Sequence, residues 1–319
     1  MAKRFPFSDF PSGWYVVGLS EELPPKGVLT RRYFDREIVL YRTESGELRA
    51  TDPFCPHLGG HLGQARVEGD VLRCGFHGWK FDGAGKCVRA YGQNVPKTGV
   101  ATWRAVERNQ TLLVWFDARG REPTWEVPVI DPTGWTPFRF RKLAFNSHPQ
   151  ETSENSVDFG HFTEVHSFSK AWVVEEAVAE GPLLKATYGI TKSFDLPKPL
   201  GQLGVDVTFH VQVHGLGYSY VQGEVPSLRI QYRHLILSTP VHDGRVHMRL
   251  ATSVKKLPNP ILTEMAHRMA FKGLCDEVES DMPIWEAKRY VERPVLAKGD
   301  GPIHKYRKWA KQFYPEAAA

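Results

Sequence analysis

Two pairs of cysteine and histidine stand close together in the first third of this 319-residue chain. The first pair is Cys55-Pro-His57, and after sixteen intervening residues comes Cys74-Gly-Phe-His77. Each pair offers one thiolate and one imidazole. Together they supply the ligands of a [2Fe–2S] cluster in which two histidines replace two cysteines on one iron, the Rieske arrangement. On this interpretation Cys55 and Cys74 bind one iron, and His57 and His77 bind the other.

Glycines flank both ligand pairs, at Gly59 and Gly60 and at Gly75 and Gly78. They allow the backbone to curl close to inorganic sulfide, where N–H groups can tune the cluster potential. The alternative is a zinc site, but a structural zinc site normally has two cysteines in its first pair. His61 follows the first pair, and we interpret it as a loop or packing histidine.

A second group of potential ligands is Asn155-x-x-Asp158-x-x-His161-x4-His166. On a regular helix, residues i and i+5 point about 140° apart, so a helix end or a distortion must bring the two imidazoles to one metal. Asp158 lies three residues before His161 and can fix the tautomer of an imidazole. Two histidines and one carboxylate form the facial triad of a mononuclear iron(II) oxygenase. Two ordinary histidines on an amphipathic helix are the alternative.

The carboxylate of such a triad must come from elsewhere in the chain. Candidates are Asp276, Glu277, Glu279 and Asp281, in a late helical segment. Asp281 precedes the apolar run Met-Pro-Ile-Trp and can face inward, whereas the other three suit a solvated helix face. The residues alone do not choose firmly among the four.

The hydrophobic patterns divide the chain into a β-rich part and a mixed part. Polar residues with Gly and Pro near 118–128 suggest two domains, residues 1–122 and residues 123–319. Strands are predicted at 13–19, 36–42, 71–73, 112–116, 183–193, 205–213, 227–238 and 246–253, and helices at 151–166, 261–285 and 302–313.

The composition is that of a globular protein, with 41% hydrophobic and 24% charged residues and a net charge of +5. Basic residues are scattered, so we expect no nucleic-acid partner. No stretch is long and apolar enough to predict a membrane span, and no signal peptide is evident. With four cysteines, two of them assigned to a cluster, we expect a cytoplasmic protein.

The two motifs resemble those of the Rieske non-haem iron oxygenases, and the similarity extends over nearly the whole chain. Cys55-Pro-His57 with Cys74-Gly-Phe-His77-Gly-Trp79 is similar to the family's cluster motif, and Asn155 to His166 is similar to its iron motif. The resemblance implies that the third iron ligand is Asp281, in Ser280-Asp281-Met-Pro-Ile-Trp285. Ser280 departs from the glutamine that usually precedes this ligand.

The resemblance also implies the architecture. The expected fold class is α+β, with an N-terminal all-β Rieske [2Fe–2S] domain and a C-terminal helix-grip-like catalytic domain, an antiparallel sheet flanked by helices. Members form homotrimers in which the cluster of one subunit lies near the iron of the next. Carried over, His77 hydrogen-bonds Asp158 of a neighbouring copy, and Asp158 bonds His161. Asp158 and Asn155 are thus the candidate catalytic residues.

The C-terminal run from Asp281 to Tyr314 is most similar to 3-ketosteroid 9α-hydroxylases and cholesterol 7-desaturases. The resemblance implies a terminal monooxygenase component that hydroxylates or desaturates an apolar polycyclic substrate, a steroid or sterol, with O2. Because no G-x-G-x-x-G follows a strand, electrons must come from a separate ferredoxin-type or flavin reductase. The alternatives are hydroxylation or O-demethylation of a smaller aromatic acid, and a Rieske electron carrier without oxygenase activity.

Overall fold

The computed structural model describes residues 4–8, 10–92, 94–195, 202–242 and 244–315. It contains two compact units. One comprises residues 13–129 and 241–243, and the other comprises 1–12, 130–240 and 244–319. The main boundary between the units lies between Val129 and Ile130. Whether residues 1–122 and 123–319 are independently folding domains stays a prediction.

The first unit consists of short antiparallel strands in three sheets, ordered β1-β11-β10, β2-β3-β4-β9 and β5-β6-β7-β8. Its strands are β1 (Gly13–Leu19), β2 (Val28–Tyr33), β3 (Arg36–Arg42), β4 (Leu48–Thr51), β5 (Arg66–Glu68), β6 (Val71–Arg73), β7 (Lys80–Phe81), β8 (Cys87–Arg89), β9 (Thr102–Trp103), β10 (Ala105–Arg108) and β11 (Thr111–Phe116). Two 3-10 turns, η1 (Ser20–Glu22) and η2 (Leu62–Gln64), complete it. The segment with Cys74 and His77 connects β6 to β7, and the segment with Cys55 and His57 lies between β4 and η2.

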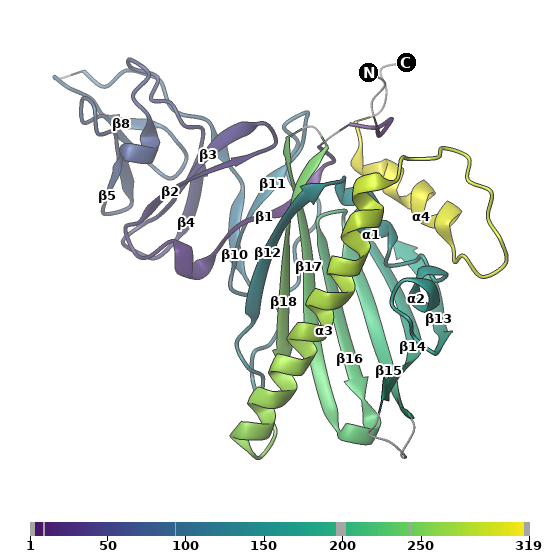
Figure 1. Ribbon diagram of the computed structural model, residues 1–319. Coiled ribbons are helices and arrows are strands. Elements are labelled where there is room, and N and C mark those ends of the chain that lie inside the picture. The colour runs from purple at the N-terminus through teal and green to yellow at the C-terminus, as the bar shows by residue number, and fades with distance from the viewer. Residues whose placement is uncertain (1–3, 9, 93, 196–201, 243, 316–319) are drawn as a thin grey trace. The chain divides into compact units, whose positions relative to one another are not determined.

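The second unit is built on one seven-stranded sheet, ordered β12-β18-β17-β16-β15-β14-β13 (Figure 1). Its strands are β12 (Arg139–Asn146), β13 (Lys170–Glu180), β14 (Leu183–Asp195), β15 (Gln202–His214), β16 (Tyr218–Val225), β17 (Ile230–His242) and β18 (Arg245–Val254). Its helices are α1 (Pro149–Glu154), α2 (His161–Glu164), α3 (Pro260–Ala287) and α4 (Ile303–Ala310), with 3-10 turns η3 (Pro226–Leu228) and η4 (Lys311–Phe313). None of the described helices is long and apolar enough to cross a membrane.

The long helix α3 crosses the sheet and packs on β12 and β18 (Figure 1). Asn259 starts the helix, because its side chain accepts hydrogen bonds from the N–H groups of Ile261 and Leu262. Near the other end the ring of Trp285 stacks on Phe145 of β12, with centroids 5.5 Å apart. The predicted α+β class, with an antiparallel sheet and helices in the second half, is confirmed.

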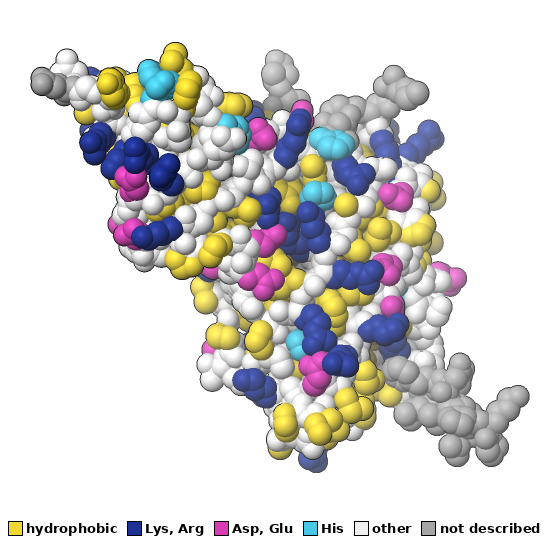
Figure 2. Space-filling view, turned by 60° about the vertical axis from the view of Figure 1, so that its left-hand side comes forward, with side chains coloured by type: hydrophobic (Ala, Val, Ile, Leu, Met, Phe, Trp, Pro, Cys, Tyr) yellow, Lys and Arg dark blue, Asp and Glu magenta, His cyan; other side chains and the backbone are white. Residues whose placement is uncertain are grey.

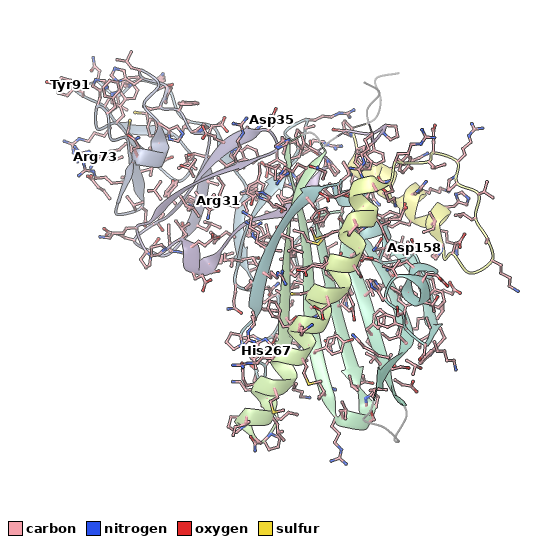
Figure 3. All side chains as sticks on the ribbon, viewed as in Figure 1. Arg31, Asp35, Arg73, Tyr91, Asp158 and His267 are labelled. Atoms are coloured by element: carbon pink, nitrogen blue, oxygen red, sulfur yellow. The ribbon has the colours of Figure 1, made fainter. Side chains whose placement is uncertain are left out.

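Most predicted elements agree with the structure, but the helix expected at 151–166 is wrong. Helix α1 ends at Glu154 and α2 begins at His161, with turns between them. Asp158 therefore lies in the connection beside α2 and not on a helix face shared with His161 (Figure 3). The strands β12 and β13 were not predicted, because their alternation is interrupted by charged residues on an exposed face.

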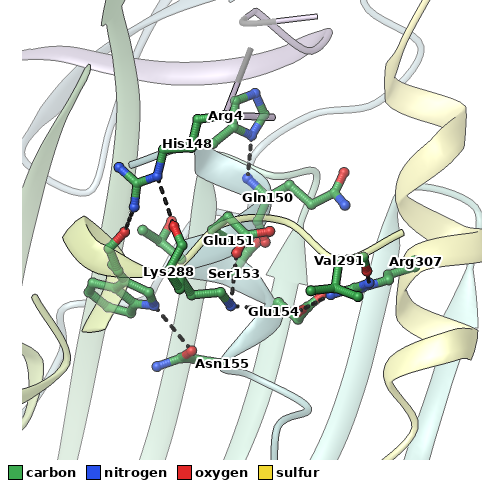
Figure 4. A network of polar contacts seen from close by, with 12 residues as sticks. Arg4, His148, Gln150, Glu151, Ser153, Glu154, Asn155, Lys288, Val291 and Arg307 are labelled. Carbon is green, nitrogen blue, oxygen red and sulfur yellow. Dashed lines mark hydrogen bonds and ion pairs between the residues drawn. The ribbon is translucent and has the colours of Figure 1, made fainter. Parts of the chain in front are cut away.

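Helix α1 is short and fully buried, and charged partners from later segments hold it in place (Figure 4). Glu154 accepts two hydrogen bonds from the Arg307 guanidinium of α4, at 2.7 and 2.9 Å. Glu151 pairs with the ammonium of Lys288 at 2.8 Å, just after α3. Because Asn155 directly follows the last residue of α1, this network also positions one of the candidate site residues.

We predict that Arg307→Met lowers the stability of this unit. The substitution leaves the buried carboxylate of Glu154 without its guanidinium partner, which costs about 3 to 5 kcal/mol. Chemical unfolding followed by tryptophan fluorescence measures the loss. Arg268→Met is the matched control, because Arg268 makes an exposed ion pair with Glu264, and exposed pairs contribute at most about 1 kcal/mol. Equal losses in the two variants would contradict the assignment.

Candidate active site

Two loops of the N-terminal unit carry the four predicted cluster ligands. In the first loop, Gly59 N donates to Cys55 O at 3.0 Å and Cys55 N donates to Gly60 O at 2.9 Å. In the second, Gly78 N donates to Cys74 O at 3.1 Å, and Cys74 N donates to Trp79 O at 2.8 Å. The two loops thus share one hydrogen-bond pattern, although their ligand spacing differs by one residue.

Glycine is required at specific points of these loops. Gly59 and Gly78 both have a positive φ, +72° and +70°, which favours glycine over other residues. At Gly60 the constraint is the neighbouring loop, because an added Cβ would lie 3.1 Å from Cys74 Sγ. The glycines noted in the sequence therefore close each turn and let the two loops approach each other.

The ligand atoms suit an iron–sulfur cluster. Cys55 and Cys74 are buried and free, and burial raises the pKa of the Cys55 thiol to about 11. The rings of His57 and His77 lie 4.7 Å apart, and His57 stacks on Trp79. His57 Nδ1 is buried and has no hydrogen-bond partner among the described residues. Two thiols and two imidazoles, one with an orphaned nitrogen, fit the donor set of the predicted cluster.

His61 has a structural role in the same region. Its Nδ1 accepts a hydrogen bond from Gly63 N at 3.0 Å and so caps the 3-10 turn η2. Its Nε2 lies 3.5 Å from a carboxylate oxygen of Glu37. These contacts agree with the interpretation of His61 as a loop histidine.

In the C-terminal unit, ligand atoms of His161, His166 and Asp281 lie within 4.8 Å of one another. His161 is the first residue of α2, and His166 lies just beyond its last residue, Glu164. The helix end thus removes the divergence expected for residues five apart. Asp281 comes from α3, and its Oδ1 lies 3.6 Å from His166 Nε2. The structure brings together the three residues that the resemblance selected.

Hydrogen bonds at Nδ1 turn both imidazoles so that Nε2 is left for a metal. His161 Nδ1 contacts the main-chain carbonyl of Asp158, whereas the carboxylate of Asp158 lies at 3.8 Å. His166 Nδ1 lies 3.2 Å from Ser280 Oγ. Since the Ser280 hydroxyl donates its hydrogen to Glu277 O, it must accept from His166 Nδ1–H. Ser280, which departs from the family pattern, is thus a positioning residue that sequence reasoning missed.

The carboxylate of Asp281 is held by Asn155, which is held in turn by Trp285. The Asn155 amide donates to its Oδ2 at 3.0 Å, and Asn155 Oδ1 accepts from the Trp285 indole N–H at 3.3 Å. Oδ2 is therefore engaged, and Oδ1 is the atom on the side of His166. Asn155 acts here through Asp281 and is a positioning residue.

Burial sets the protonation of this group before any metal binds. It lowers the pKa of His166 to about 4, so the imidazole is neutral at pH 7 and able to bind a metal. Burial also raises the pKa of Asp281 to about 6, while the hydrogen bond from Asn155 opposes the rise. A buried carboxylate beside two imidazoles calls for a cation, so these residues fit a mononuclear iron.

A cavity of about 320 Å³ opens beside these three residues. Alternate residues of the sheet form one wall, because successive side chains of a strand point to opposite faces. The wall is apolar over most of its area and includes Ile190, Val205, Val207, Phe209, Val211, Val221, Ile230 and Ile236. Helix α3 lines the opposite side, with Ala266, Met269, Leu274 and Val278. The volume of the cavity lies at the lower end of the range for small-molecule sites.

One ion pair interrupts this apolar lining. Lys192 of β14 contacts Glu277 of α3, with Nζ 3.0 Å from Oε1. The expectation that Glu277 lies on a solvated helix face is therefore wrong. Glu277 precedes Asp281 by four residues, so both side chains lie on one side of α3. This four-residue spacing from Asp281 is the feature of the sequence that indicates a cavity-facing position for Glu277.

Both halves of the chain match known families. Residues 13–104 match the Rieske [2Fe-2S] domain, and residues 114–314 match the 3-ketosteroid 9alpha-hydroxylase C-terminal domain. This chain belongs to the 3-ketosteroid 9α-hydroxylase family of Rieske oxygenases. It is a Rieske-type monooxygenase whose cofactors are a [2Fe–2S] cluster and a mononuclear non-haem iron. The alternative of an electron carrier without oxygenase activity is wrong.

Among the relatives of this Rieske oxygenase is "Cholesterol 7-desaturase nvd" of Bombyx mori, 32% identical over 96% of this chain and 70% of that protein. An oxygenase component of "3-ketosteroid-9-alpha-monooxygenase" from Rhodococcus rhodochrous is 29% identical over 96% of this chain and 84% of that protein.

Solved structures of the same fold include dicamba monooxygenase bound to dicamba, with a TM-score of 0.70 and 21% identity over 96% of this chain and 98% of that one. NdmA of Pseudomonas putida with caffeine has a TM-score of 0.72 and 19% identity over 93% of this chain and 89% of that one. At these identities the likeness shows the fold.

We predict that Asp281→Asn stabilises the metal-free oxygenase at neutral pH. Because the folded-state pKa of Asp281, about 6, exceeds the unfolded value of about 3.9, the wild type loses stability as pH rises between these values. The free energy of unfolding of the variant should exceed that of the wild type by about 3 kcal/mol at pH 7.5, and the difference should become small near pH 4. Unfolding of chelator-treated protein across this pH range measures it.

Asp276→Asn is the control for this prediction, since Asp276 is exposed on the same helix and pairs with Lys272. Its stability relative to the wild type should not follow the same pH profile. If Asp281→Asn is no more stable than the wild type at pH 7.5, burial does not destabilise this carboxylate as inferred.

Proposed function

We propose that this Rieske oxygenase is the terminal component of a multicomponent system that hydroxylates or desaturates a neutral polycyclic substrate, a steroid or sterol. It uses O2 and electrons from a separate reductase of the ferredoxin or flavin type. The observation that carries the proposal is the apolar cavity that adjoins His161, His166 and Asp281. The names of the relatives, a cholesterol desaturase and a ketosteroid monooxygenase, support the same substrate class.

The charges in the cavity favour a neutral substrate over an aromatic acid. A carboxylate transferred into an apolar cavity needs a cation that is free to pair with it. Among the described lining residues Lys192 is the one ammonium or guanidinium group, and Glu277 already neutralises it. Burial also lowers the pKa of the lining histidine His234 to about 3, so its ring is uncharged.

The proposed residue roles follow from the two ligand groups. Cys55, His57, Cys74 and His77 hold the cluster, and His161, His166 and Asp281 hold the iron. When bound, these groups supply single electrons and the activation of O2, respectively. Asn155 and Ser280 keep the ligands in one orientation, and the apolar walls exclude water from the substrate.

The proposed assembly is a homotrimer with electron transfer between subunits. His77 is exposed in its unit, and 37% of the Asp158 side chain is exposed in the other. Neither side chain is buried by its own unit, which supports the proposal that His77 of one copy contacts Asp158 of another. On this proposal Asp158 connects the two metal groups, and its main-chain carbonyl also orients His161.

Lysine and arginine on the face drawn in Figure 2 are interspersed with acidic side chains. This arrangement agrees with the scattered basic residues of the sequence. The expectation of no nucleic-acid partner stays a prediction.

A substrate panel tests the proposed function. The reduced enzyme with a surrogate reductase is given a 3-ketosteroid, a sterol and methoxylated or unsubstituted aromatic acids under O2. We expect oxygenated or desaturated product only from the steroid or sterol, as measured by mass spectrometry. His161→Ala serves as the control, because it removes an iron ligand, retains the visible spectrum of the cluster and forms no product. Turnover of the aromatic acids alone would refute the proposal.

We predict that Asp158→Ala slows electron transfer without loss of either metal. The substitution removes the carboxylate proposed to contact His77 of another copy but keeps the carbonyl that orients His161. Single-turnover oxidation of the cluster, followed by absorbance, should slow at least about tenfold, equivalent to about 1.4 kcal/mol. Glu164→Ala, an exposed acid on the same segment, is the control. Cluster oxidation at the wild-type rate would exclude the bridging role.

A further inference from the structure

Apart from the proposed metal ligands, the Lys192–Glu277 pair is the one ion pair between described residues that line this largely apolar cavity. Lys192 lies on the sheet wall and Glu277 on α3, so the pair links the two sides. About a third of each side chain is exposed, 36% for Lys192 and 35% for Glu277. Because both residues line the cavity, this exposure leaves them accessible to whatever the cavity contains.

The ammonium of Lys192 has donors to spare. It carries three N–H groups, and Glu277 is its one hydrogen-bond acceptor among the described residues. Gly273 lies one helical turn before Glu277 on α3, and a Cβ added at Gly273 would lie 3.8 Å from Lys192 Nζ. Because glycine has no side chain, nothing at this position covers the ammonium. Two N–H groups therefore remain for a ligand or for water.

The pair stands next to the proposed metal ligands. Glu277 lies one helical turn before Asp281, a rise of about 5.4 Å along α3. Lys192 Nζ lies 5.7 Å from the ring centroid of Phe168, two residues after His166. A ligand atom bound at Lys192 would thus hold the rest of an apolar molecule beside His161, His166 and Asp281.

The charge of the pair selects the kind of group that it can bind. Burying an ion pair costs desolvation energy that two apolar side chains would not cost, so stability alone does not explain it. Glu277 offsets the charge of Lys192, which leaves a directional donor with little net charge. Such a donor suits the neutral oxygen of a ketone or hydroxyl group and has no surplus charge for a carboxylate.

We propose that Lys192 and Glu277 form a polar subsite that binds the ketone or hydroxyl oxygen of an otherwise apolar substrate. Lys192 donates the hydrogen bond, and Glu277 holds the ammonium in place as a positioning residue. The subsite fixes which end of the substrate lies at the metal ligands. The inference rests on the proposed function, since it names the group by which a steroid-like substrate is oriented.

Ligand binding without turnover tests the subsite. The oxidised, fully metallated enzyme is titrated under anaerobic conditions with androstan-3-one and with androstane, the same skeleton without oxygen, and tryptophan fluorescence gives each Kd. We expect Lys192→Met to raise the Kd of the ketone about ten- to a hundredfold, the effect of losing one hydrogen bond from a charged donor. The Kd of androstane should change less than about threefold.

Three further variants complete the design. Lys185→Met is the matched control, because Lys185 lies on the same strand, pairs with Glu180 and does not line the cavity. Lys192→Arg retains a donor and should retain the preference for the ketone. If Lys192→Met loses iron, the double variant Lys192→Met with Glu277→Gln, which leaves no unpaired carboxylate, is compared in its place.

The outcomes separate this inference from the proposed function. If the wild type binds neither compound, the steroid-like substrate class is wrong. If it binds both with equal affinity, or if Lys192→Met weakens both equally, the cavity takes the skeleton but the polar subsite is wrong. A selective loss of ketone affinity, together with an unchanged cluster spectrum, iron content and melting temperature, supports the subsite.

Discussion

A carboxylate buried among apolar groups is the constraint on which the catalytic unit depends. Asp281 is 6% exposed, and burial raises its pKa. Its charged form is stable only where partners compensate for lost hydration. Asn155 supplies one hydrogen bond, and a cation held by Asp281 and the two imidazoles would supply the rest. The ionic network around α1 serves this arrangement, because α1 places Asn155 against α3.

The long strands of the sheet make the cavity possible. Strands β14, β15 and β17 each span thirteen residues, and their alternate side chains form a continuous apolar wall beneath α3. Such a wall does little to orient a substrate, because apolar contacts are not directional. Orientation must come from the few polar groups in the lining. The Lys192–Glu277 pair is placed to provide it, one turn of α3 away from Asp281.

Much of the fold could be predicted from local patterns. Strands β1, β3 and β14 and helix α3 follow from apolar alternation or from a long stretch with few breakers. The connection between α1 and α2 could not be predicted in this way. Residues 151–166 have helical spacing, but the chain must turn between the helices to place His161 and His166 on one side. Tertiary packing there overrides the local preference.

The sequence by itself determined the types of ligand and the turns that carry them, because Cys55, His57, Cys74 and His77 act within short loops whose glycines set the backbone. It also marked His161 and His166. The residues alone left four acids open, and the resemblance to a family pointed to Asp281. The tertiary structure brings Asp281 to the two histidines and orients each side chain. Asp281, Ser280 and the partner of Lys192 all lie on α3, and each comes more than eighty residues after Lys192 of β14. The burial and the hydrogen-bond partners of these side chains depend on which distant elements pack together. The spacing of residues along the chain does not predict that packing.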